Sequence, residues 1–151
     1  MPDGPLSHSR ALRASLSGFD AKRCTGEDAA VIAEDLAATE KACAAARAMA
    51  AARAAECGAH RQKGFADAAD WLARASGTSM VEAKAALATA VALRDMPDTR
   101  AAATAGEVSL AQATELARTE AECPGSEAEL LPIARTGSLR DLRDRATKTR
   151  L

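Results

Sequence analysis

Three observations predict an all-α fold, with one long N-terminal helix followed by a compact bundle of short helices. Hydrophobic residues make up 48% of the 151 residues, yet aromatic residues make up only 2%, and alanine dominates the apolar set. The β-branched and aromatic residues that strands favour are therefore scarce. No segment keeps up an alternation of apolar and polar residues, and several glycines are followed closely by serine or threonine, as at helix ends and starts.

The individual helices follow from these end and start signals. Ser79, Ser109 and Ser126 are each followed three residues later by Glu or Gln, which is the capping-box pattern of a helix N-terminus. Thr25 and Ser138 are weaker versions, with aspartate in the fourth place. We expect helices over residues 6–16, 27–57, 66–75, 80–94, 98–105, 110–122, 127–134 and 139–149.

The chain length indicates one domain with an N-terminal extension. We expect a short helix and linker over residues 1–24 and a helical domain over 25–151. Within that domain, 25–58 forms a long helical arm and 66–151 forms a bundle that contains a helix-turn-helix-like corner.

Composition also limits the function classes. The 20 basic and 21 acidic residues give a net charge of -1, so any nucleic-acid site must be a local patch. The four cysteines form no CxxC pair and are expected to be reduced and half-buried. No apolar run approaches the roughly 20 residues that a membrane span needs, and no signal peptide is recognisable. A cytoplasmic protein without a membrane partner is expected.

The long helix carries a stripe of mostly small residues at alternating steps of four and three, which is the spacing of a coiled-coil seam. This stripe either pairs two copies of the chain or docks on the following helices; an alanine seam alone buries little area. The predicted oligomer interface consists of Ile32, Leu36, Cys43, Ala46 and Ala50.

No self-sufficient active site is expected. With His8, His60 and no paired cysteines, the chain offers no recognisable metal-ligand set, and it has no Gly-rich phosphate loop and no G-x-S-x-G elbow. His60 is expected to be solvated just past a helix end. No catalytic residue, metal, cofactor or small-molecule substrate is therefore predicted.

Residues 67–93 resemble a helix-turn-helix, with Gly77 in the turn and small residues where the two helices cross. In such a motif the second helix lies in the DNA major groove. The outward residues of that helix would be Thr78, Ser79, Glu82 and Lys84, with Arg94 at its far end. Any tight helix-helix corner also needs a glycine and small crossing residues, so a purely structural corner is the alternative.

A second candidate DNA surface is the basic C-terminus, where six cations outnumber Asp141 and Asp144. The alternative is a solvated helix with Asp–Arg pairs. An acidic block between Glu107 and Glu129 would repel DNA, so any DNA should bind elsewhere. The six cations are Arg135, Arg140, Arg143, Arg145, Lys148 and Arg150.

The segment from Trp71 to Ala117 combines a W-L-A opening, G-T-S, an alanine-rich helix that closes on A-L-R-D-M-P, and A-G-E-V-S-L-A-Q-A. This combination resembles the 13E12-repeat family, a domain of unknown function that precedes HNH endonuclease modules in high-GC bacteria. The resemblance covers most of the chain from about residue 27. It implies a helical domain next to a nuclease, and full-length relatives that are HNH endonucleases.

The same segment distantly resembles the helix-turn-helix core of ParB-type partition proteins. The residues that carry this resemblance are Gly77, Ser79, Leu87, Pro97, Gly106, Ser109 and Ala113. The segment before the proline is longer than in those proteins. An HNH motif needs histidines and an asparagine, whereas this chain has no Asn and no second histidine near His60. We therefore expect either a region excised from a longer nuclease or a stand-alone member.

Together these patterns predict a non-catalytic module that positions a nuclease on double-stranded DNA. The alternative is a helical oligomerisation or protein-interaction module, for instance a homodimer through the long helix, without direct DNA contact. A free-standing hydrolase is the least expected class, because no cluster of titratable groups is recognisable.

Overall fold

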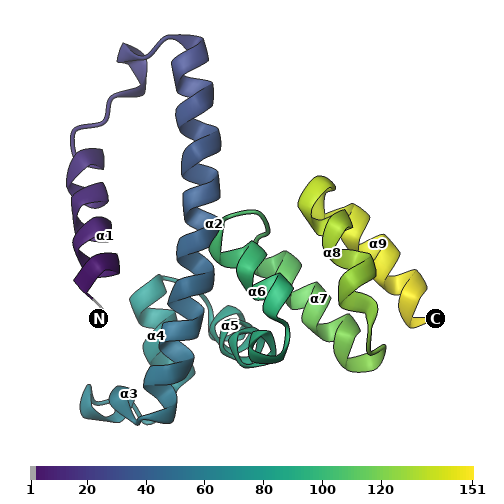
Figure 1. Ribbon diagram of the computed structural model, residues 1–151. Coiled ribbons are helices and arrows are strands. Elements are labelled where there is room, and N and C mark those ends of the chain that lie inside the picture. Colours follow the sequence, from purple (N-terminus) through teal and green to yellow (C-terminus); the bar gives the residue numbers. More distant parts are fainter. Residues whose placement is uncertain (1–2) are drawn as a thin grey trace. The chain divides into compact units, whose positions relative to one another are not determined.

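The computed structural model describes residues 3–151, and this part of the chain contains helices and no strand (Figure 1). The all-α prediction is confirmed. The two short 3-10 helices are η1 (Ala21–Arg23) and η2 (Leu93–Asp95). The α-helices are α1 (Asp3–Leu16), α2 (Gly26–Glu56), α3 (Ala59–Gln62), α4 (Ala68–Ser76), α5 (Met80–Ala92), α6 (Pro97–Thr104), α7 (Leu110–Glu122), α8 (Ser126–Thr136) and α9 (Leu139–Arg150).

Most of the predicted helix starts are confirmed, because the predicted serine or threonine accepts a backbone N–H group in the first turn of its helix. Ser109 and Ser138 form complete capping boxes with Gln112 and Asp141. The hydroxyl of Ser79 accepts the Glu82 backbone N–H at 3.1 Å, and the hydroxyl of Thr25 accepts that of Asp28 at 3.1 Å. These hydrogen bonds are local, which is why the sequence pattern locates them.

Ser126 is the exception, because it does not cap α8. The N-cap is Gly125, and Ser126 is buried in the first turn with its hydroxyl donating to Glu120 Oε2 at 3.1 Å. Glu120 also accepts the backbone N–H groups of Gly125 at 2.8 Å and Glu127 at 2.7 Å. A carboxylate accepts hydrogen bonds more strongly than a hydroxyl, so the glutamate of the preceding helix replaces the expected serine cap.

The short helices η1, η2 and α3 are not predicted from the sequence. Asp20 caps η1 by accepting the Lys22 N–H at 3.1 Å. The helix expected over residues 80–94 ends as an α-helix at Ala92 and continues as η2. Gly58, expected to end the long helix, has φ 71° and begins α3. Single helical turns have too few residues for an apolar period to be recognised.

The chain divides into two compact units, one up to Leu36 and one from Ala37 to Leu151. The boundary lies inside α2, whereas the sequence places it near residue 24. Burial accounts for the difference, because the buried residues of the described chain all lie between Ala45 and Ala146. The helix α2 therefore begins in a unit whose described side chains are not buried and ends in a unit with a core.

The first unit contains α1, η1 and the start of α2. From residue 4 to residue 36 its side chains are exposed or partly exposed, including the large apolar residues Leu6, Leu16, Phe19 and Val31. Asp20 and Thr25 provide the caps that start its two later helices.

The second unit has its main core where α6, α7, α8 and α9 meet. Leu93, Val108, Leu116, Leu130 and Leu142 are its large, almost fully buried side chains, and alanines fill the remainder. A smaller cluster joins α4 and α5 to the end of α2, through Ala51, Leu72, Ala73 and Ala83. Small side chains let helix axes approach closely, which explains how a chain with 2% aromatic residues builds a core.

Candidate functional site

The α4–α5 corner is built as the sequence predicts. Asp67 begins α4 by accepting the Ala69 N–H at 2.9 Å, and Gly77 ends it in the left-handed conformation, with φ 67°. The Thr78 N–H returns to the Ala73 carbonyl at 3.0 Å, and Ser79 then caps α5. Val81, Lys84 and Val91 of α5 are exposed beyond this corner, so their side of the helix is a candidate binding surface.

The residues predicted to contact DNA from α5 are exposed but carry little positive charge. Thr78, Ser79, Glu82 and Lys84 are all exposed, although the Ser79 hydroxyl is engaged as the N-cap. Arg94 lies in η2 and forms an ion pair with Glu56 of α2. Among the predicted residues of this corner, Lys84 is therefore the cation that no carboxylate neutralises within the described chain.

Exposed apolar side chains lie on the same helix. Val81, Val91 and Met80 are 77%, 49% and 38% exposed. Apart from Leu151 at the chain end, they are the exposed large hydrophobic residues of the second unit.

The six predicted cations of α8 and α9 do not form a separate basic surface, because the acidic block lies among them. Arg135 pairs with Glu107 at 2.9 Å and Arg145 with Glu129 at 2.8 Å. Arg150 contacts Glu122 at 3.5 Å. The basic surface expected at the C-terminus is therefore largely neutralised, since α7 and α8 bring carboxylates beside α9. The pairs of Arg135 and Arg145 are exposed and contribute roughly 0–1 kcal/mol each.

Arg140 and Lys148 differ from the other four cations. Both are exposed on α9, and neither has an ion-pair partner among residues 3–151. They are eight residues apart, so their directions around the helix axis differ by about 80°.

A buried carboxylate organises the junction of α7 and α9. The side chain of Glu115 is 7% exposed and lies 3.6 Å from Arg118, 3.4 Å from Arg143 and 3.9 Å from Arg150. Arg150 also donates to the Thr119 hydroxyl at 2.9 Å. A buried charge must be paired, and here three guanidinium groups surround one carboxylate.

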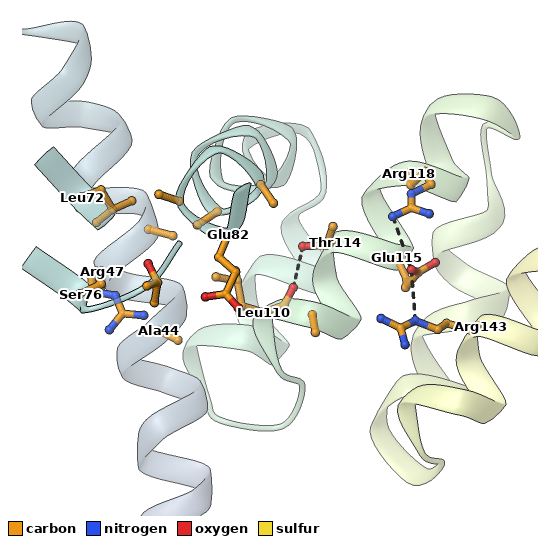
Figure 2. Close-up of a pocket in the computed structure, with 16 residues that line it drawn as sticks. Ala44, Arg47, Leu72, Ser76, Glu82, Leu110, Thr114, Glu115, Arg118 and Arg143 are labelled. Atoms are coloured by element: carbon orange, nitrogen blue, oxygen red, sulfur yellow. Dashed lines mark hydrogen bonds and ion pairs between the residues drawn. The ribbon is translucent and has the colours of Figure 1, made fainter. Parts of the chain in front are cut away.

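A pocket of about 390 Å³ lies between α2, α4, α5 and α7 of the second unit (Figure 2). Leu72, Ala83, Ala86 and Leu110 contribute apolar walls. Figure 2 shows Arg47 and Ser76 on one side and Arg118, Glu115 and Arg143 on the other, with Glu82 and Thr114 between them. A shallower hollow of about 240 Å³ shares Ala85, Thr114 and Arg118 with it.

The polar residues of this pocket were not identified from the sequence. Arg47 is one of several cations on an alanine-rich helix, and Ser76 is one of several serines near a helix end. What distinguishes Ser76 is that its Oγ is buried without a hydrogen-bond partner in the described structure. The burial of this hydroxyl depends on how α4 packs against α2 and α5, so no local sequence pattern predicts it.

The predicted seam of α2 faces outward in the second unit. Cys43, Ala46 and Ala50 are exposed, whereas Ala45, Ala48 and Ala52 of a neighbouring stripe are buried in the core. Ile32 and Leu36 belong to the first unit and are partly buried. The prediction that the seam docks on the following helices is therefore wrong for Cys43, Ala46 and Ala50. The stripe that packs into the core is the neighbouring one, formed by Ala45, Ala48 and Ala52.

His60 is buried rather than solvated. Its residue is 6% exposed and its Nδ1 has no hydrogen-bond partner in the part of the chain described. The expectation of a solvated residue failed because α3 continues the chain after Gly58 and carries His60 inward.

Three carboxyl groups have pKa values below their usual range. Hydrogen bonding from Arg94 lowers the pKa of Glu56, the backbone N–H of Gly125 lowers that of Glu120, and the backbone N–H of Ser138 lowers that of Asp141. The first belongs to an exposed ion pair and the other two to helix caps, so each shift has a structural explanation.

No group of three or more His, Cys, Asp or Glu side chains in residues 3–151 is arranged to hold a metal ion. Over the same residues, no helix has the length and apolar character to cross a membrane. Comparisons with protein-family models, with curated proteins and with solved structures find no match. The resemblance to the 13E12-repeat family therefore stays a prediction from the sequence.

Proposed function

We propose that the chain is a non-catalytic self-association module, in which the second unit pairs with a second copy through the exposed side of α5. The observation that carries this proposal is the concentration of exposed large apolar side chains on one helix, with Val81 77% and Val91 49% exposed. Exposed apolar side chains that gather on one surface are typical of protein interaction sites.

The pattern on α5 suits a symmetric contact. Val81, Lys84 and Val91 are separated by three and seven residues and share one side of the helix. Lys84 is the charged residue on that side. In an antiparallel pair of α5 helices, Val81 of each copy would face Val91 of the other copy. A two-fold contact of this kind is self-complementary.

The α2 seam supports this role less well. Its exposed residues Cys43, Ala46 and Ala50 are small, and at about 25 cal/mol per Å² their burial contributes little. The valines of α5 offer more apolar area, which is why the contact is assigned to α5.

Sedimentation velocity from micromolar to millimolar concentration tests the proposal. Wild-type chain should shift from monomer to dimer, and the double variant Val81→Glu, Val91→Glu should stay monomeric with unchanged helix content. Ala46→Glu is the control, because it introduces a negative charge on the exposed side of α2. A wild-type monomer at every concentration would refute self-association, and loss of the dimer in Ala46→Glu alone would move the contact to α2.

DNA binding is the second candidate, and the helix-turn-helix corner favours it. The α4–α5 turn presents Thr78 and Lys84 outward, and Arg140 and Lys148 remain unpaired among the described residues. Anisotropy of a labelled duplex at low and physiological salt tests this role. Salt-sensitive binding that weakens in Arg140→Glu, Lys148→Glu but not in Arg61→Glu would support it. Absence of binding at low salt would exclude it.

A further inference from the structure

One hydroxyl group of the second unit is left without a partner where the pocket begins. The hydroxyl groups of Thr104, Thr114 and Thr119 each donate to a backbone carbonyl one helical turn earlier, at 2.9–3.0 Å. Ser76, in the last turn of α4, makes no such bond, although its Oγ is buried. A buried polar atom without a hydrogen bond destabilises the fold, and it becomes satisfied when a ligand supplies the acceptor.

A cation lies on the same side of the pocket. Arg47 of α2 lines the pocket, and Figure 2 shows it beside Ser76. Arg47 has no ion-pair partner in the described chain, in contrast to Arg118 and Arg143, which both contact Glu115. A guanidinium group and a hydroxyl donor together form the recognition chemistry of a carboxylate or phosphate.

The remaining walls are apolar. Leu72 and Ala83 are buried, and Ala48, Ala86 and Leu110 complete the surface around them. The volume of about 390 Å³ lies within the range of about 300–1,000 Å³ that is usual for small-molecule sites. The pocket stays open because many of its lining side chains are as short as alanine and none is aromatic.

We propose that this pocket binds a small organic anion with an apolar body, which lies against Ala83, Ala86 and Leu110. Arg47 holds its carboxylate, and the buried Ser76 hydroxyl donates to it once the serine side chain has rotated toward the pocket. Three cations and two carboxylates line the pocket, so its balance is positive. Glu115 is already surrounded by arginines, whereas Glu82 is exposed and faces the bound anion. Glu82 therefore opposes binding, and its charge sets the affinity.

Phenylbutyrate is a suitable probe, with phenylbutanol and phenylbutylamine as its neutral and cationic counterparts. The fluorescence of Trp71 reports binding, because it is the single tryptophan of a chain without tyrosine and packs against the cluster that contains Leu72 and Ala83. Amide chemical shifts of α4, α5 and the first turn of α7 locate the bound probe. We expect phenylbutyrate to cause saturable chemical-shift changes in these segments. The alcohol and the amine should bind at least tenfold more weakly.

Variants test the assigned roles. Arg47→Gln should weaken binding of phenylbutyrate about tenfold or more, because a hydrogen bond to a charged group is lost. Glu82→Gln should strengthen it several-fold, and the matched control Arg61→Gln should leave it unchanged. The proposal would be overturned if phenylbutyrate and phenylbutanol bound equally well, or if Arg47→Gln bound phenylbutyrate as tightly as the wild type. Weaker binding by Glu82→Gln, or chemical-shift changes outside the pocket, would also overturn it. The monomeric Val81→Glu, Val91→Glu variant should bind equally well, so this site stands or falls independently of self-association.

Discussion

Glu127 Oε1 accepts two hydrogen bonds from Thr99, one from its backbone N–H and one from its hydroxyl, each at 2.9 Å. Thr99 is fully buried in the first turn of α6, where backbone N–H groups have no acceptor within the helix. Met96, the N-cap residue of α6, makes no side-chain cap. A residue 28 positions later in the sequence, on α8, therefore caps α6 and ties the two helices together.

Replacing Glu127 by alanine should lower the free energy of unfolding by about 2 kcal/mol, since two donors of buried Thr99 lose their acceptor. Urea unfolding followed by Trp71 fluorescence measures the change. Glu129→Ala is the matched control, because it removes a glutamate of the same helix that makes one exposed ion pair with Arg145. It should cost less than about 1 kcal/mol. Equal effects of the two variants would show that the Thr99 cap is not important for stability.

Acid should destabilise the fold partly through Glu120. The backbone N–H groups of Gly125 and Glu127 lower the pKa of this carboxyl in the folded state. A lowered folded-state pKa contributes stability that is present above the unfolded pKa, about 4.3 for glutamate, and is lost as pH falls toward the folded pKa. Urea unfolding of wild type and Glu120→Gln between pH 6 and pH 3 should show a stability difference that shrinks with acid. A difference that stays constant with pH would argue against this role.

Gly106 should tolerate no side chain. Its φ is +80°, and a Cβ there would overlap the backbone carbonyl of Ala38 on α2. Gly77→Ala is the comparison, since Gly77 has φ +67° with open space around it and its cost is conformational, about 1–2 kcal/mol. Gly106→Ala should destabilise by at least about 1 kcal/mol more, because the α6–α7 turn must move away from α2. Similar unfolding midpoints for the two variants would contradict the close approach.

Thiol reactivity should divide the four free cysteines into two classes. Cys43 and Cys57 are exposed, whereas Cys24 and Cys123 are partly buried, with Cys123 Sγ 3.6 Å from the Thr149 carbonyl. A thiol reagent at neutral pH should modify Cys43 and Cys57 first, since access limits the attack. Peptide mass mapping after short exposure identifies the modified sites. Early labelling of Cys123 would show that the last turn of α9 opens readily.

Local features of the fold were predictable from the sequence, whereas the partners of charged groups were not. The start of α7 at Leu110 was predicted because Ser109 and Gln112 cap it within four residues. Ser126 has the same pattern but fails, because Glu120 from the preceding helix competes for the same N–H groups. A single sequence shows the local cap that Ser109 and Gln112 form, but it does not show that Glu120 replaces Ser126 as the cap of α8.

The candidate sites follow the same division. The α4–α5 corner depends on Gly77 and Ser79, which are neighbours in sequence, and was predicted. Neutralisation of Arg145 by Glu129 depends on the packing of α8 against α9 and was not predicted. The unpartnered hydroxyl of Ser76 likewise arises from tertiary packing, so the pocket becomes recognisable in three dimensions alone.

The Glu120 cap also bears on the order in which the chain folds. All of its partners lie within seven residues, so the α7–α8 corner closes a very short loop and loses little chain entropy. Such contacts form early, before distant segments have met. We therefore expect this corner to form before Thr99 of α6 and the arginines of α9 make their contacts with α7 and α8.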